Sequence, residues 1–249
     1  MINFRNIPPV VKNLLIINGL FFLATLVLGN QGVNLTEYLG LHYWKSDGFY
    51  PHQLVTYMFM HSSFDFTHIL FNMFAVWMFG RVLEQVWGSK RFLIYYVITG
   101  MGAGIIQLLV AHFRLMSLYE VLSPEAMDYA IQHGYDLMHG GKGLSVYVEN
   151  PDFVQAVILM NSTTVGASGA VFGILLAFGM LFPNTELMLL FPPIPIKAKW
   201  FVMGYGALEL YMGFANNPND NVAHFAHLGG MLFGFILIKI WKKDRSNFY

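Results

Sequence analysis

The chain has 249 residues, of which 56% are hydrophobic and 11% charged, and its mean hydropathy is +0.52. Soluble domains carry about 25% charged residues, so this composition predicts an integral membrane protein. The formal net charge of zero gives no basis for a nucleic-acid partner, and the lack of cysteine excludes disulfides, thiolate metal sites and cysteine nucleophiles.

Six segments are candidate membrane spans, since a spanning helix needs about 20 mostly apolar residues. They are residues 12–30, 67–87, 91–112, 167–183, 198–215 and 222–241. The first follows Arg5 and Lys12, as a signal peptide would, but no small-x-small cleavage site comes after it, so we expect a retained span. The expected fold class is an all-α bundle of six transmembrane helices in a single domain over residues 1–249.

Two connections between the spans are long. Residues 31–66 are rich in aromatic side chains, which suits a loop lying in the headgroup region against membrane lipid. Residues 113–165 hold six of the 14 acidic side chains, and within this connection we expect residues 119–141 to form one or two short helices at the outer face.

The Lys and Arg residues predict the orientation. With a cytoplasmic N-terminus, the inner side receives eleven of them and the outer side only Lys45, Arg114 and Lys142. An excess of positive charge inside is the usual rule. We therefore expect both termini in the cytoplasm, with the protein in a bacterial inner membrane.

Polar residues gather in the first turns of the second, fourth and sixth spans, which all enter from the outer face in this orientation. These residues are His68 with Asn72, then Ser168, then His224 with His227. Counted along the helices, Ser168 and His227 lie roughly 2–8 Å inside the membrane. Ionisable groups in a bilayer are costly and usually functional.

A serine and a histidine at one depth make a nucleophile and its base. A serine is a poor nucleophile until imidazole accepts its proton. Ser168 also begins a helix, where unpaired N–H groups favour an oxyanion, and His68 and Asn72 can donate further hydrogen bonds. Gly166 leaves room beside the serine for a substrate backbone.

Each feature also has a simpler explanation. Small residues commonly pack membrane helices, so Gly169 with Gly173 and Gly230 with Gly234, both GxxxG patterns, predict close contact of the fourth and sixth spans in any case. His68 and Asn72 can be an interhelical pair. His224 and His227 can ligate a metal, but HExxH is absent and we expect no acidic ligand beside them, so we expect neither metal nor cofactor.

Taken together, the motifs resemble those of the rhomboid family of intramembrane serine proteases. The family pattern HxxxN is matched by His68-ILF-Asn72, and the pattern GxSG by Gly166-A-Ser168-Gly169. The pattern AHxxGxxxG is matched in the sixth span, where it includes His227, Gly230 and Gly234. A further signature, GxxxExxxG, reads Gly80-RVL-Glu84-QVW-Gly88.

The resemblance implies a serine endopeptidase. Ser168 is then the nucleophile, His227 the base and acid, and the Ser168 N–H forms the oxyanion hole with His68 and Asn72. Phe172 corresponds to an aromatic residue that stacks on the histidine. The fifth span would move as a lateral gate, the loop near residues 214–221 would cap the site, and the substrates would be single-span membrane proteins cleaved near the outer face.

Three features depart from the family pattern. Gln53 stands near an expected loop arginine, Phe172 lacks the hydroxyl of a tyrosine, and the 113–165 connection is long. Two rival functions are a catalytically inactive rhomboid-like protein that binds clients, and a channel or transporter. An inactive relative typically loses the serine or histidine, which this chain keeps, and the acidic or basic residues of an ion path are lacking.

Glu209 is the carboxylate inside the fifth span, roughly 9 Å deep and near the depth of His227. One interpretation is a group that ties this helix to a neighbour, and the other is a partner that orients His227. We expect the first, with a two-residue mechanism, so Glu209→Gln should cost less than about tenfold in rate.

Overall fold

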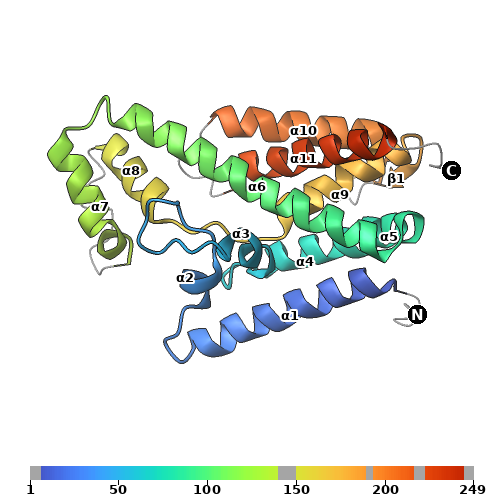
Figure 1. Cartoon of the computed structure of the whole chain (residues 1–249), viewed down its shortest axis with the longest axis horizontal. Coiled ribbons are helices and arrows are strands. Elements are labelled where there is room, and N and C mark those ends of the chain that lie inside the picture. Colours follow the sequence, from blue (N-terminus) through green and yellow to red (C-terminus); the bar gives the residue numbers. More distant parts are fainter. Residues whose placement is uncertain (1–6, 140–149, 189–192, 216–221, 244–249) are drawn as a thin grey trace.

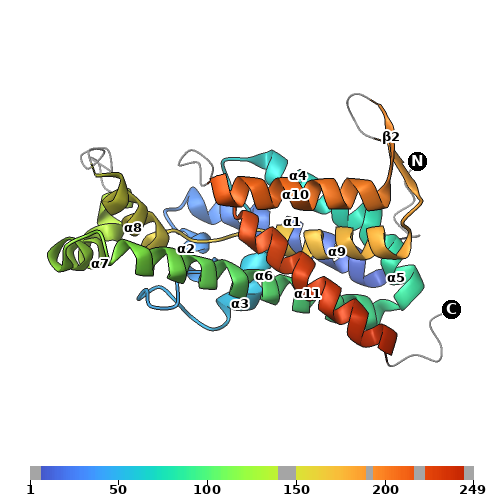
Figure 2. The same cartoon turned by 90° about the horizontal axis from the view of Figure 1, so that it is seen from above.

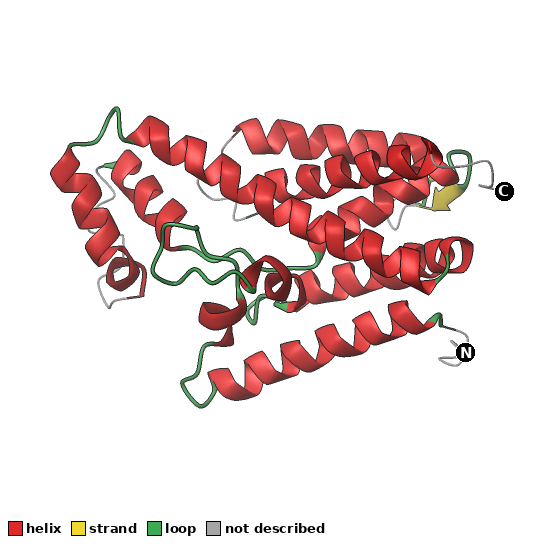
Figure 3. Ribbon diagram, viewed as in Figure 1, coloured by secondary structure: helices red, strands yellow, loops and turns green. Residues whose placement is uncertain are grey.

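The computed structural model describes residues 7–139, 150–188, 193–215 and 222–243, and nearly all of its regular structure is helical (Figures 1 and 3). The long helices lie side by side in one bundle, with α7 and α8 beyond one end of it (Figure 1). The elements are α1 (Pro9–Gly29), α2 (Leu35–Leu39), α3 (Gln53–Thr56), η2 (Tyr57–Phe59), α4 (Phe66–Ala75), η3 (Val76–Gly80), α5 (Arg81–Trp87), α6 (Ser89–Leu118), α7 (Pro124–His139), α8 (Pro151–Asn161), α9 (Ser168–Leu181), β1 (Glu186–Met188), β2 (Pro195–Lys197), α10 (Ala198–Ala215) and α11 (His224–Lys243).

All six predicted spans are helices, with ends displaced by a few residues, except that α6 runs six residues past its predicted end at 112 to Leu118. Four helices of the described chain are long and apolar enough to cross a membrane: Pro9–Gly29, Phe66–Trp87, Ser89–Leu118 and His224–Lys242. The apolar helix Ser168–Leu181 has only 14 residues, and Ala198–Ala215 has 18. The start of α1 and the end of α11 lie at the same end of the bundle (Figure 1).

Glu84 joins α5 to the first helix. Its buried carboxylate accepts hydrogen bonds from the backbone N–H of Val10 at 2.9 Å, of Val11 at 2.8 Å, and from Ser89 Oγ at 2.6 Å. The first N–H groups of a helix lack partners within it and attract negative charge. Glu84 therefore has a structural role, because it caps α1.

Gln53 organises the first loop from within. Its side chain is 0% exposed; the amide oxygen accepts from the N–H of His42 and of Tyr50, and the amide nitrogen donates to the carbonyls of Gly48 and Tyr38. A buried amide with partners on both sides fixes the backbone around it. The residue that departs from the family pattern thus anchors this loop through hydrogen bonds.

The 113–165 connection contains two short helices: α7 lies in the stretch 119–141 that was predicted to be helical, whereas α8 was not predicted, and residues 140–149 lie outside the described chain. These helices share a small apolar core with the extended end of α6, built around Leu115, Met127, Phe153 and Val157. The chain then returns to the bundle through Thr164, which pairs with Leu41 of the first loop by two backbone hydrogen bonds of 2.9 Å.

Helix α11 packs against both α6 and α9, and Figure 2 shows it beside α9. A Cβ added at Gly230 would overlap the carbonyl oxygen of Gly169, and one at Gly234 would lie 3.5 Å from the Cα of Gly173. The two GxxxG faces therefore meet, as the sequence predicted. This contact brings the start of α9 next to the start of α11.

Candidate active site

Ser168 and His227 meet where α9 and α11 begin. The Ser168 Oγ lies 2.8 Å from the Nε2 of His227. His227 is 8% exposed, whereas Ser168 is only half-buried, so the hydroxyl keeps access from outside the bundle. A nucleophile and a base within hydrogen-bond distance are the geometry that proton transfer from the serine requires.

Phe172 lies one turn after the serine and holds the imidazole from one face. Its ring is stacked on His227 with the centroids 4.2 Å apart and the planes 9° apart. Tyr205 of α10 packs in turn against Phe172, with ring centroids 5.0 Å apart. The aromatic contact that the resemblance implied for Phe172 is present without a hydroxyl.

Glu209 lies behind His227. Its Oε2 is 2.8 Å from the Nδ1 of His227 and 2.6 Å from the Nδ1 of His224, and all three side chains are buried. A carboxylate only accepts, so each Nδ1 donates its hydrogen. The Nε2 of a neutral His227 is then unprotonated and accepts from the serine.

The expectation that no acidic ligand lies beside the two histidines is wrong, because the fold brings Glu209 next to both of them. Glu209 comes from α10 and is far from them only along the chain. These three residues offer one ligand atom each, all within 4.8 Å of one another, so among the described residues they form the group that could hold a metal ion. At 2.6 and 2.8 Å from the carboxylate oxygen, both histidine nitrogens are at hydrogen-bond distance from it.

Gly166 shapes the space in front of the serine. Its φ is +126°, which favours glycine, and its N–H donates to the carbonyl of Tyr57 at 3.0 Å. A Cβ at this position would lie 2.8 Å from His68 Nε2 and 3.6 Å from Ser168 Oγ. The imidazole of His68 and the serine hydroxyl therefore both lie close to Gly166, and a side chain at this position would crowd them.

Asn72 follows His68 by one turn and is buried. Its Nδ2 donates to the His68 carbonyl at 2.8 Å. An amide carries two N–H donors, and this bond uses one of them. This bond holds the Asn72 side chain on the same face of α4 as His68. The i, i+4 spacing predicted that the two residues share a face.

His61 is a neighbour that the sequence did not reveal. It is 1% exposed, and its ring lies edge-on to that of His68 with the centroids 5.1 Å apart. It comes from the segment between η2 and α4, where no periodic pattern marks a buried position. His61 therefore packs edge-on against the ring of His68.

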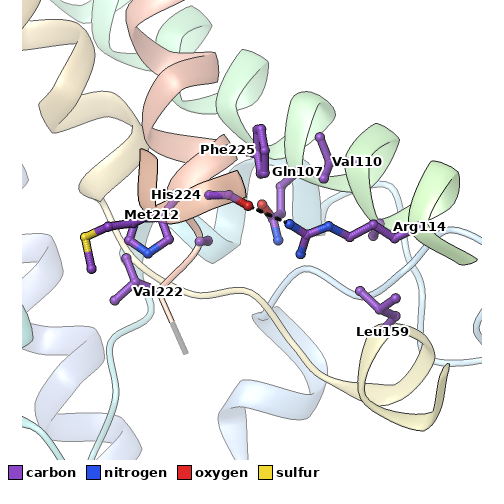
Figure 4. Close-up of a pocket in the computed structure, with 11 residues that line it drawn as sticks. Gln107, Val110, Arg114, Leu159, Met212, Val222, His224 and Phe225 are labelled. Atoms are coloured by element: carbon purple, nitrogen blue, oxygen red, sulfur yellow. Dashed lines mark hydrogen bonds between the residues drawn. The ribbon is translucent and has the colours of Figure 1, made fainter. Parts of the chain in front are cut away.

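A pocket of about 60 Å³ lies beside His224 (Figure 4). A pocket of this volume can hold only a few water molecules. At its edge Arg114 of α6 donates from Nη2 to the Gly213 carbonyl near the end of α10, at 2.9 Å, and its guanidinium lies over the ring of Phe225. Arg114 thus links α6 to the end of α10 and the start of α11. The predicted capping loop near 214–221 falls mostly on residues 216–221, which lie outside the described chain.

The fold and the site together define a class of membrane protein. A family model for the Rhomboid domain matches residues 49–117 and 145–243, which is more than half of the chain. The chain belongs to the rhomboid family.

Several curated proteins are similar along most of this chain. RHOMBOID-like protein 12, mitochondrial, of Arabidopsis thaliana is 27% identical over 241 residues, which cover 96% of this chain and 60% of that protein. The putative rhomboid protease YdcA of Bacillus subtilis is 28% identical over 197 residues, or 78% of this chain and 69% of that one. Rhomboid protein 1, mitochondrial, of Saccharomyces cerevisiae is 25% identical over 187 residues, or 74% and 41%.

These relatives support a location in a membrane, in agreement with the apolar helices. Two of their names carry a mitochondrial location and the third protein is bacterial. The expectation of a bacterial inner membrane is therefore not supported by the relatives.

Proposed function

We propose that this protein is an intramembrane serine endopeptidase that cleaves single-span membrane proteins near one face of the membrane. The observation that carries the proposal is the 2.8 Å hydrogen bond between Ser168 Oγ and His227 Nε2, made between two helix starts inside an apolar bundle. Membership of a protease family that works in membranes supports the same reaction class.

Each residue of the site has a separate role in the proposed reaction. Ser168 Oγ attacks the scissile carbonyl carbon while His227 Nε2 accepts the hydroxyl proton. The oxygen of the tetrahedral intermediate takes the negative charge, with the Ser168 N–H, His68 and Asn72 as donors. His227 then gives its proton to the leaving amine, and a water activated by the same imidazole releases the acyl group from the serine.

The enclosure of the site favours a membrane-embedded substrate. The pair lies at the starts of α9 and α11, and α10 bears Glu209 beside it. We infer that α10 moves to admit a substrate helix from the lipid. Arg114, which bonds to the end of α10, would then hold the closed position.

A six-span arrangement with both termini in the cytoplasm agrees with the distribution of Lys and Arg.

The experiment for this function is cleavage of a panel of single-span proteins in liposomes that contain the purified full chain. We expect the wild type to cut one or more of them and Ser168→Ala to cut none. Binding of intact clients without cleavage would favour an inactive client-binding protein, and ion or solute flux without cleavage would favour a channel. Either result would contradict the proposed protease function.

Asn72→Ala should slow turnover by ~10²–10³, because removing one donor to a developing oxyanion typically costs that much. The loss should appear in kcat and leave KM nearly unchanged, since the bond strengthens only in the transition state. Ser168 should still react with a fluorophosphonate. A wild-type kcat for Asn72→Ala would mean that this side chain only bonds to its own helix.

A further inference from the structure

We propose that Glu209 is a positioning residue that acts through His227, so that this protein works with a carboxylate-supported histidine rather than with serine and histidine alone. His224 completes the arrangement by holding the same carboxylate oxygen. The inference deepens the proposed function and rests on it, because a positioned base has meaning only if Ser168 is a nucleophile.

The first step is the direction of the hydrogen bonds. Oε2 of Glu209 is within 2.8 Å of both Nδ1 atoms and can only accept, so His227 carries its hydrogen on Nδ1. The other tautomer would direct an Nε2–H at the serine and remove the base. Glu209 therefore selects the one neutral form of His227 that can accept the Ser168 proton.

The second step is charge. When His227 accepts the proton it becomes an imidazolium in a low-dielectric interior, where an isolated charge is costly. The carboxylate of Glu209 is already in contact with this ring and needs no rearrangement to stabilise the new charge. In soluble serine proteases, removal of the equivalent carboxylate charge costs ~10⁴ in rate.

The third step is the function of His224. It precedes His227 by three residues, so the two rings project from neighbouring positions on α11. A second donor at 2.6 Å on the same oxygen fixes the carboxylate, which would otherwise rotate between its two oxygens. His224 thereby stabilises the orientation of Glu209, and through it that of His227.

Glu84 provides a comparison between a buried carboxylate with a purely structural role and one that positions the base. It is as buried as Glu209, but its partners are two backbone N–H groups and a serine at the start of other helices. Its bonds stabilise the fold and touch neither Ser168 nor His227. Glu84→Gln is therefore a matched control for Glu209→Gln, because both changes remove a buried charge and keep the shape.

The test measures kcat, KM and the melting temperature of the two variants with a cleaved single-span substrate. Glu209→Gln should lower kcat by about a hundredfold or more with KM within about twofold, since the lost interaction belongs to the transition state. Glu84→Gln should lower the melting temperature and leave kcat per folded molecule within about twofold. This expectation replaces the loss of under tenfold that a packing role for Glu209 predicts.

A kcat for folded Glu209→Gln within tenfold of the wild type would overturn the positioning role while leaving the protease intact. Failure of the wild type to cleave any substrate would instead remove the proposed function, and this inference with it.

A spectroscopic measurement on the wild type keeps the inference testable if the variant does not fold. ¹⁵N NMR of histidine-labelled protein distinguishes the two imidazole tautomers, and the His227 signal is identified by its loss in His227→Ala. We expect hydrogen on Nδ1 of His227. Hydrogen on Nε2 of the neutral ring would contradict the role assigned to Glu209.

Discussion

Ser168→Ala and His227→Ala should each abolish measurable cleavage, and the double variant should be scarcely worse than either. The two side chains share one proton transfer across a 2.8 Å hydrogen bond, so the loss of either removes the same step. In enzymes with such a pair, single removals cost up to ~10⁶ in kcat and are far from additive. The measurement is kcat for the three variants with one single-span substrate in liposomes.

Ser117→Ala is the control for the serine change. This serine is exposed near the end of α6, where its hydroxyl donates to the Arg114 carbonyl, and its removal should leave kcat unchanged. Measurable activity in both single variants, with losses that add in the double variant, would contradict a shared role for Ser168 and His227.

Gly230→Ala should destabilise the protein by about 3 kcal/mol or more, at the upper end of overpacking costs, because the new methyl group would overlap the Gly169 carbonyl. That corresponds to a loss of roughly 10 °C in melting temperature. Activity should fall as well, because Gly169 follows the nucleophile directly and any separation of α9 from α11 lengthens the hydrogen bond of Ser168. Gly230→Val should leave little folded protein.

Gly19→Ala provides the matched control for this change. Gly19 also lies within a long apolar helix, but nothing is within 4 Å of an added Cβ, so alanine should be neutral or stabilising there. Equal melting temperatures for Gly230→Ala and the wild type would show that α9 and α11 do not need this close approach.

Much of this arrangement could be predicted because membrane helices follow from local composition. An apolar run of about 20 residues forms a helix wherever it lies, since its backbone groups must bond within the segment. That Ser168 and His227 lie at one level of the bundle then followed from counting along the helices, and the glycine spacing predicted which faces meet. The contact of Gly230 with Gly169 is the clearest example.

The partners of the buried carboxylates could not be predicted in the same way. Whether Glu209 faces lipid or His227 depends on the rotation of α10, and a helix that is apolar on all sides carries no strong pattern to fix it. Glu84 lies in a recognisable motif, but its bonds to Val10 and Val11 join segments more than 70 residues apart. His61 and Gln53 are buried by loops, whose paths the hydrophobic pattern does not specify.

Reaction with a fluorophosphonate, followed by mass spectrometry of the full-length protein in detergent, tests the central claim most directly. The reagent forms a stable bond only with a serine that a neighbouring base activates. We predict labelling of Ser168 in the wild type and none in His227→Ala, with both proteins folded by their melting temperatures. No label on the folded wild type, or equal labelling of Ser168 without His227, would contradict the account.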